Sequence, residues 1–238
     1  MADGSPTLHE APHGPVGVLT AHPDRLLLQQ AALAGVGFVV VDAEQTGLQP
    51  ADVAAVVGQL AGLPTEVHVR VPDLAPATLV AFANTGADEL VLPQVRDAGD
   101  VRRAHEATRY APAGTRSRQV SAASDFGTDF SREPRLSVLV ENGDAVANAE
   151  KLAALDLLAG AWVGPTDLAD DLARQGRTED VQELVGRVVD VFRAAGRPIG
   201  LPAVDATGVT AAFARGADRV AVYFEKSLRL LLDGLVAA

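Results

Sequence analysis

Residues 38–42, FVVVD, form a run that is apolar at every position until its final aspartate. A strand that is buried on both faces has this continuous pattern, whereas a half-exposed strand alternates apolar and polar residues. A helical pattern over residues 23–33 precedes the run, and another over 50–60 follows it, with Pro50 in its first turn. This order predicts a parallel sheet built from alternating strands and helices.

The same alternation continues along the chain and predicts eight strands, each followed by a helix. The strands are expected at residues 16–20, 38–42, 66–71, 89–93, 137–140, 161–164, 198–202 and 219–223. The helices are expected at residues 23–33, 50–60, 75–84, 97–108, 144–155, 178–195 and 207–215, with a last one from Ser227. This is an α/β pattern, and we expect a single (β/α)8 barrel over residues 16–238 after a flexible tail at residues 1–15.

An open, doubly wound sheet is the competing architecture. Such a sheet would need a glycine-rich phosphate turn after its first strand. Residues 19–23 are LTAHP at that point, and we find no dinucleotide or nucleotide fingerprint in the chain. The closed barrel is therefore the preferred prediction.

Composition narrows the classes of function. The 238 residues carry 20 Lys and Arg against 31 Asp and Glu, a formal net charge of −11, and 4% are aromatic. Such a chain is a poor partner for nucleic acid or an anionic membrane. The absence of cysteine excludes disulfides, thiolate catalysis and cysteine-ligated zinc. Residues 1–15 lack the features of a signal peptide, so we expect a cytoplasmic location.

Polar side chains gather near the ends of the expected strands, which is where barrel enzymes place their chemistry. They are His22, Asp42, Glu44, Gln45, His68, Arg70, Gln94, Glu141, Glu225, Lys226 and the segment 164–167 (GPTD). Acids that meet at one rim need a cation or ligand to offset their charge. Carboxylates without histidine or cysteine beside them suit a hard ion such as Mg²⁺ or Mn²⁺.

Five sequence motifs follow one another along the chain. They are residues 37–44 (GFVVVDAE), 69–72 (VRVP), 86–95 (GADELVLPQV) with the following 107–116 (ATRYAPAGTR), 140–141 (VE) and 164–168 (GPTDL). In this order they resemble the motifs of the HpcH/HpaI aldolase and citrate lyase family, the metal-dependent pyruvate aldolases. The resemblance covers about residues 15–236. It implies a TIM barrel of the phosphoenolpyruvate/pyruvate-binding type, assembled as a homo-oligomer, a hexamer or trimer, whose last helix is exchanged between subunits.

The resemblance also implies roles for the rim residues. Glu141 and Asp167 would hold the divalent ion, and Glu44 would support its waters. Arg70 would bind the keto oxygen or carboxylate of a small 2-oxo acid. The turn at the start of the following helix would hold the carboxylate through backbone N–H groups, and it comprises Gly164, Pro165, Thr166 and Asp167. The ion would stabilise the enolate formed when a carbon–carbon bond breaks or forms.

The chain departs from the family pattern at the general base. The pattern continues after Glu44 with a histidine that pairs with an aspartate on the third helix, and the matching residues here are Gln45 and Asn84. An amide cannot exchange a proton near neutral pH. The paired change indicates that another residue acts as the base or that the reaction needs none.

Two histidines are the candidate replacements for the base. His68 lies two residues before Arg70, so both side chains point to the same face of the strand. His22 lies at the end of the first strand. Glu225 and Lys226, after the last strand, are less favoured.

Three functions are therefore left open. The first is a metal-dependent carbon–carbon lyase, of the aldolase or retro-aldolase type, with a divergent base. The second is metal-assisted decarboxylation of a 2-oxo acid or cleavage of a specialised metabolite, which needs no such base. The third is a ligand-binding protein without catalysis. A free acid is preferred over a coenzyme A thioester, because the basic residues are not clustered apart from Arg102 and Arg103.

Overall fold

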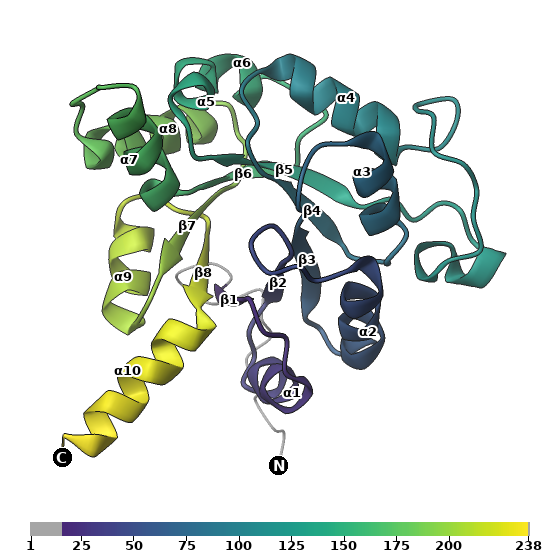
Figure 1. The fold of residues 1–238 in the computed structure, drawn as a ribbon, viewed down its shortest axis with the longest axis horizontal. Coiled ribbons are helices and arrows are strands. Elements are labelled where there is room, and N and C mark those ends of the chain that lie inside the picture. The colour runs from purple at the N-terminus through teal and green to yellow at the C-terminus, as the bar shows by residue number, and fades with distance from the viewer. Residues whose placement is uncertain (1–15, 238) are drawn as a thin grey trace, which may run out of the picture.

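Eight parallel strands close into a barrel in the computed structural model, which describes residues 16–237 (Figure 1). The strands pair in chain order, and β8 returns to β1. They are β1 Val16–Thr20, β2 Phe38–Asp42, β3 Glu66–Arg70, β4 Glu89–Leu92, β5 Arg135–Val140, β6 Gly160–Val163, β7 Ile199–Ala203 and β8 Arg219–Tyr223. The predicted α/β barrel is confirmed, whereas the expected tail at residues 1–15 lies outside the described residues.

Helices surround the strands and bury their apolar faces against them (Figure 1). They are α1 Arg25–Leu33, α2 Pro50–Leu60, α3 Pro76–Ala83, α4 Ala98–Thr108, α5 Gly143–Ala147, α6 Ala149–Ala153, α7 Pro165–Arg174, α8 Val181–Ala194, α9 Ala206–Ala214 and α10 Phe224–Val236. Aspartate side chains accept hydrogen bonds from the first backbone N–H groups of four of them, which fixes where these helices begin. The caps are Asp24, Asp97, Asp180 and Asp205.

The structure differs from the predicted pattern in three segments. Between β6 and β7 it has two helices: α8 corresponds to the predicted helix 178–195, and α7 extends the helix start that was expected at residues 164–167 as far as Arg174. The predicted helix 144–155 is two short helices that meet at Asn148. Between the predicted helix 97–108 and the predicted strand 137–140, where the sequence pattern predicts no helix or strand, the structure has a 3₁₀ helix at Ala122–Gly127. The first difference matters for function, because α7 starts directly after β6 at the rim of the barrel.

The interior of the barrel is filled in layers. Its middle layer is apolar and comprises Leu19, Val40, Val91, Leu139, Trp162 and Ala221. Two glycines make room for aromatic rings beside it: a Cβ on Gly17 would lie 2.3 Å from the Phe38 ring, and one on Gly200 would lie 2.2 Å from the Trp162 ring. This layer separates a polar network below it from the charged residues at the carboxyl ends of the strands.

Helix α10 leaves the barrel and ends away from it (Figure 1). None of its residues is buried. Its exposed apolar side chains are Leu228, Leu230, Leu231, Leu232, Leu235 and Val236. Among residues 16–237, no helix is both long enough and apolar enough to cross a membrane.

Candidate functional site

Charged side chains close the end of the barrel at which the strands finish. Arg70 is the last residue of β3, and Glu141 directly follows β5. Asp167 lies in the first turn of α7, after β6. Beneath them a cavity of about 50 Å³ reaches down to Trp162 in the apolar layer. The structure thus brings together the residues predicted to bind the metal and the substrate.

Arg70 is fixed by two carboxylates. Its Nε and Nη2 donate to the two carboxylate oxygens of Asp42 at 2.9 and 2.6 Å, and its Nη1 lies 3.0 Å from Oε2 of Glu44. Burial alone would lower the pKa of Arg70, but the hydrogen bonds and charge of Asp42 and the charge of Glu44 outweigh it and raise the pKa. The guanidinium therefore stays charged and holds one orientation at the wall of the cavity.

Glu141 is a buried acid with one free oxygen. Its side chain is 2% exposed, and its Oε1 accepts hydrogen bonds from the backbone N–H and the side-chain amide of Gln94 at 2.7 and 3.0 Å. Its Oε2 has no hydrogen-bond partner among the described residues. Burial, helped by the charges of Glu44 and Asp167, raises the pKa of Glu141 to about 7. A buried carboxylate oxygen in this position needs a cation or a proton.

Gln94 positions this acid, a role that the sequence did not reveal. Its backbone adopts a left-handed conformation, with φ of +53°, which is uncommon for a residue other than glycine. Such strain costs on the order of 1–3 kcal/mol and persists only where the surroundings enforce it. Here Gln94 donates two hydrogen bonds to a single oxygen of Glu141, which leaves the other oxygen facing the site.

These acids fit a hard divalent ion. Burial raises the pKa of Glu44 as well as that of Glu141, and the charge of Asp167 adds to both. A cation beside Glu141 would relieve this repulsion. Gly164 keeps the space open, because a Cβ there would lie 3.0 Å from the Glu141 Cβ and 3.6 Å from its Oε2. Within residues 16–237 no cluster of three or more possible ligands occurs, so two carboxylates and several waters would hold the ion, as Mg²⁺ prefers.

The turn between β6 and α7 offers backbone donors beside these carboxylates. Gly164 is the N-cap of α7 and Pro165 its first residue. Pro165 has no N–H, and the N–H groups of Thr166 and Asp167 lie in the first turn, where no helical acceptor reaches them. Such a helix start suits an anionic group.

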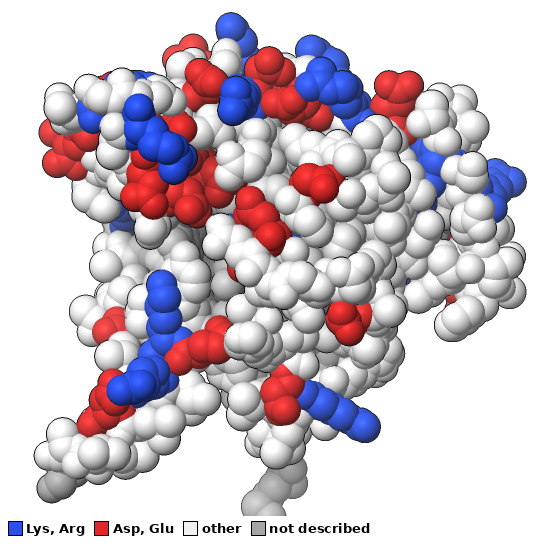
Figure 2. All heavy atoms as spheres, viewed as in Figure 1, with Lys and Arg blue, Asp and Glu red and all other residues white. Residues whose placement is uncertain are grey.

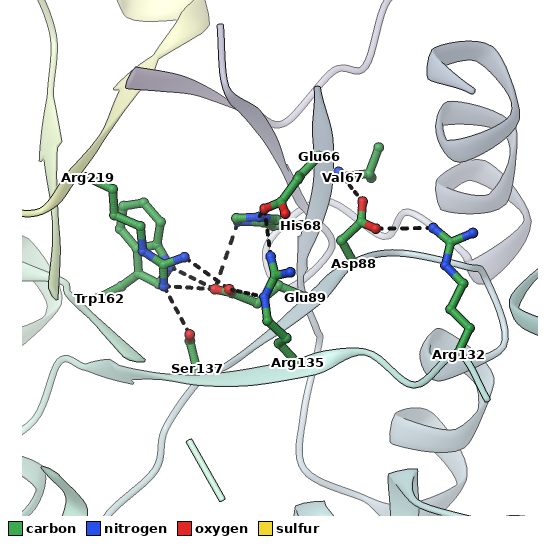
Figure 3. A network of polar contacts seen from close by, with 10 residues as sticks. All are labelled: Glu66, Val67, His68, Asp88, Glu89, Arg132, Arg135, Ser137, Trp162 and Arg219. Carbon is green, nitrogen blue, oxygen red and sulfur yellow. Dashed lines mark hydrogen bonds and ion pairs between the residues drawn. The ribbon is translucent and has the colours of Figure 1, made fainter. Parts of the chain in front are cut away.

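The structure does not bring His68 to the cavity. Its ring points into the barrel, as predicted, but it lies below the apolar layer and stacks on Phe38 with ring centroids 5.0 Å apart. Its Nε2 lies 2.9 Å from Oε2 of Glu66, at the start of β3 (Figure 3). The side chain is 1% exposed and is absent from the residues that line the cavity. Its position therefore speaks against the hypothesis that His68 replaces the missing base.

His68 instead belongs to an ion-pair network at the opposite end of the barrel (Figure 3). Glu89 is buried and accepts hydrogen bonds from Nη1 and Nη2 of Arg219 at 3.0 and 2.9 Å. Arg135 donates to Glu66 at 2.6 Å, and the Arg219 guanidinium lies 4.4 Å from the Trp162 ring centroid. Because these charges satisfy one another, the network closes the barrel rather than forming an open site.

His22 lies at the correct end of the barrel but outside the cavity. Its side chain is exposed, and its backbone N–H donates to Thr20 Oγ1 and Glu225 Oε1, each at 3.1 Å. Glu225 also accepts from the Thr20 hydroxyl at 2.6 Å, so it fixes the loop after β1. Lys226 lies 4.2 Å from the ring centroid of Tyr223. None of the three charged or imidazole side chains, His22, Glu225 or Lys226, lines the cavity.

Gln45 and Asn84, the two amides at the positions of the family's base and its partner, do not hydrogen-bond to each other among the described residues. Gln45 is exposed on the loop after β2. Asn84 ends α3, and its Oδ1 accepts two hydrogen bonds from the buried Arg116, at 3.2 and 2.6 Å. Within the described residues, Asn84 therefore anchors a buried arginine and does not orient a base.

Tyr223 is a residue of the site that the sequence analysis missed. It is the last residue of β8, and it lines the cavity together with Arg70 and Asp167. Burial raises the pKa of its phenol, the charge of Arg70 opposes this, and nearby carboxylates add to it. The sequence contains a signal for this residue. Side chains alternate along a strand, so Arg219, Ala221 and Tyr223 point to the same, inward face of β8.

Basic side chains form no large patch on the face shown in Figure 2. Lys and Arg are intermixed with Asp and Glu there, over the helices at the top of the view and along α10. On α10, for example, Arg229 pairs with Asp233 at 2.7 Å. This face therefore offers no concentrated positive field to a polyphosphate group.

Comparison with known proteins agrees with the predicted resemblance. Residues 18–228 match the family model of the HpcH/HpaI aldolase/citrate lyase family. The chain is 30% identical over 198 residues to a 5-keto-4-deoxy-D-glucarate aldolase of Salmonella gallinarum, which covers 78% of this chain and 76% of that protein.

Solved structures show the same fold. An HpcH/HpaI aldolase/citrate lyase family protein from Burkholderia cenocepacia has a TM-score of 0.86 at 26% identity, with 97% of this chain and 95% of that chain covered. The protein CitE from Mycobacterium tuberculosis, solved in complex with magnesium and pyruvate, has a TM-score of 0.60 at 22% identity, with 92% and 89% covered.

Proposed function

Because this chain belongs to the HpcH/HpaI aldolase/citrate lyase family, we propose that it is a divalent-metal-dependent carbon–carbon lyase acting on a 2-oxo acid or a related hydroxy acid. The observation that carries this proposal is the free, buried oxygen of Glu141 beside Asp167, next to a fixed Arg70. The arrangement offers carboxylates to a metal and a guanidinium to an anionic substrate on one rim.

Each group of the rim has a task in this reaction. Glu141 and Asp167 would hold Mg²⁺ or Mn²⁺, which when bound supplies an electrophile for the 2-oxo group. Arg70 binds the keto oxygen or the carboxylate of the substrate, and the N–H groups that follow Pro165 bind the carboxylate. Glu44 orders water beside the carboxylates. The apolar floor of the cavity excludes water from the carbon that carries the developing charge, which strengthens these electrostatic contacts.

Binding of oxalate, which mimics the enolate of pyruvate, tests the proposal. Trp162 is the chain's single tryptophan and lines the cavity, so its fluorescence reports binding. We expect oxalate to bind only with Mg²⁺ or Mn²⁺, and Glu141→Ala or Asp167→Ala to abolish binding. Asp170→Ala, at an exposed position of the same helix α7, is the matched control. Oxalate binding of equal affinity without metal would refute the proposed site.

Decarboxylation of a 2-oxo diacid is a second candidate reaction of the same site. It is favoured by the absence of histidine among the residues that line the cavity. Retro-aldol cleavage needs a base to remove a hydroxyl proton, whereas decarboxylation needs only an electron sink and a proton donor. Metal-dependent release of pyruvate from oxaloacetate and from 4-hydroxy-2-oxo acids distinguishes the two. Oxalate binding without turnover of either would favour a ligand-binding protein.

We also propose that the protein is a homo-oligomer, a hexamer or trimer. The exposed leucines of α10 support this, because contiguous apolar side chains on a helix without buried residues are typical of an interaction surface. Sedimentation of the full chain would give the assembly state. Leu231→Glu with Leu235→Glu is expected to lower it, and a monomeric wild-type protein would refute the proposal.

A further inference from the structure

We propose that the phenol of Tyr223 is the proton donor of this site and protonates the carbon of the enolate that carbon–carbon cleavage leaves. The inference rests on the proposed function, since it requires an enolate in the cavity. It adds a catalytic residue at the end of β8, a strand to which the family resemblance gave no role.

Tyr223 lies at the end of β8 that faces the cavity. Arg219, Ala221 and Tyr223 occupy successive inward positions of β8, and Tyr223 is the one at the carboxyl end. Its backbone pairs with Leu19 of β1. Tyr223 lines the same cavity as Arg70 and Asp167. It therefore faces the space in which a substrate held by these two groups would react.

The Tyr223 hydroxyl is not used in a hydrogen bond to another residue among residues 16–237. Among the residues that line the cavity, Tyr223 alone has a neutral O–H group. Arg70 is engaged by Asp42, and the indole N–H of Trp162 points down to Glu89 at 3.4 Å. Within residues 16–237 the Tyr223 hydroxyl makes no protein hydrogen bond, and the Lys226 ammonium lies over its ring, 4.2 Å from the centroid.

The surroundings of Tyr223 keep its phenol protonated at neutral pH. Burial raises the pKa of the phenol above its usual value of 10, so Tyr223 is protonated at neutral pH and can donate. Two cations, Arg70 at the cavity wall and Lys226 over the ring, would stabilise the phenolate that donation leaves for a short time.

The bond between carbons 3 and 4 of the 2-oxo acid breaks, and its electron pair stays on carbon 3, shared with the 2-oxo group. The Tyr223 O–H bond breaks, its proton forms a C–H bond at carbon 3, and a phenolate is left. In decarboxylation carbon 4 leaves as carbon dioxide, and the phenolate regains its proton from water. In retro-aldol cleavage carbon 4 leaves as the aldehyde, its hydroxyl proton passes to water as the carbonyl group forms, and the phenolate then regains a proton from water.

Exchange of the methyl protons of pyruvate in D₂O measures this proton transfer in reverse. Proton NMR of the full-length protein with Mg²⁺ is expected to show loss of the methyl signal. Tyr223→Phe should slow the exchange by about 10²-fold or more, the usual contribution of a general acid or base. Its affinity for oxalate, read from Trp162 fluorescence, should change less than about threefold. Tyr110→Phe, which removes the chain's other tyrosine hydroxyl, is the control and should exchange like wild type.

Each outcome decides the inference separately from the proposed function. Wild-type exchange rates in Tyr223→Phe overturn the assignment, and so does a wild-type protein that binds oxalate with metal but leaves the methyl protons in place. Parallel loss of oxalate binding and exchange in Tyr223→Phe would make it a binding residue instead. If the wild-type protein does not bind oxalate in a metal-dependent way, the result refutes the proposed function and not the role of Tyr223 alone.

Discussion

The substitution Glu141→Gln should stabilise the metal-free protein at neutral pH. The Glu141 carboxyl is 2% exposed, and burial is the main cause that raises its pKa from an ordinary 4.5 to about 7. The folded protein therefore binds this proton more tightly than the unfolded chain does, so the free energy of unfolding falls as pH rises from about 4.5 to about 7. At about 1.4 kcal/mol per pH unit, the ionised carboxylate costs the folded state about 3 kcal/mol above pH 7.

Glutamine isolates this charge effect because it keeps the shape of the side chain and one acceptor oxygen. Both donors of Gln94 can bond to that oxygen, as they do to Oε1 of Glu141. We expect the variant to unfold at a temperature about 6–12 °C higher than wild type at pH 8, since 1 kcal/mol corresponds to roughly 2–4 °C in a domain of this size. At pH 5 the difference should be small, because wild-type Glu141 is then protonated.

Thermal unfolding from pH 5 to pH 8 in the presence of a chelator measures this difference. Glu106→Gln is the control, because Glu106 is exposed on α4. Adding Mg²⁺ or Mn²⁺ should raise the unfolding temperature of wild type and leave Glu141→Gln unchanged, since binding to the folded state alone stabilises it. Parallel pH profiles for wild type and Glu141→Gln would show that this carboxyl carries no burial penalty and would refute the reasoning.

Three further predictions concern the rim and the layer beneath it. Arg70→Lys keeps the charge but loses the bidentate pair with Asp42, so the affinity for oxalate should fall at least about tenfold by tryptophan fluorescence, and unchanged affinity would contradict this. Gly164→Ala places a Cβ 3.0 Å from the Glu141 Cβ, so titration calorimetry should show weaker metal binding. His68→Gln should keep metal-dependent turnover within about threefold, but lower the free energy of unfolding by about 1–3 kcal/mol, because the buried ring bonds to Glu66 and stacks on Phe38. Loss of turnover in a folded His68→Gln protein would restore that histidine as a candidate base.

The sequence predicted the barrel because its strands are buried on both faces and read as uninterrupted apolar runs. Residues 38–42 show this best, and all five of them are buried. The start of β5 at Arg135 escaped prediction, because an exposed charged residue carries no apolar signal and its partners Glu66 and Glu89 are far away in the chain. For helix α7 only the start at residues 164–167 was expected, and its extent to Arg174 was not predicted.

The sequence predicted which side chains point to the same face of a strand, but not how far along the barrel axis each of them lies. Alternation along a strand correctly placed His68 and Arg70 on one face of β3, since both point into the barrel. Residues two apart on a strand nevertheless differ by roughly 6–7 Å along it, which is enough to put the apolar layer between them. The same rule applied to β8 would have raised Tyr223 as a candidate, but its aromatic ring reads as one more apolar residue at the end of a buried strand.

The two ends of the barrel interior show why chemistry is expected at one of them only. At the lower end the acids have hydrogen-bond and ion-pair partners: the hydrogen bond with His68 and the charge of Arg135 lower the pKa of Glu66 to about 2. At the upper end a single guanidinium, Arg70, faces an excess of carboxylates, namely Asp42, Glu44, Glu141 and Asp167. Unlike the lower network, this group is not neutralised by the described residues, and burial raises the pKa of Glu141 instead. This excess of negative charge at the open end of the cavity favours the binding of a cation, and the bound cation together with Arg70 then favours the binding of an anionic substrate.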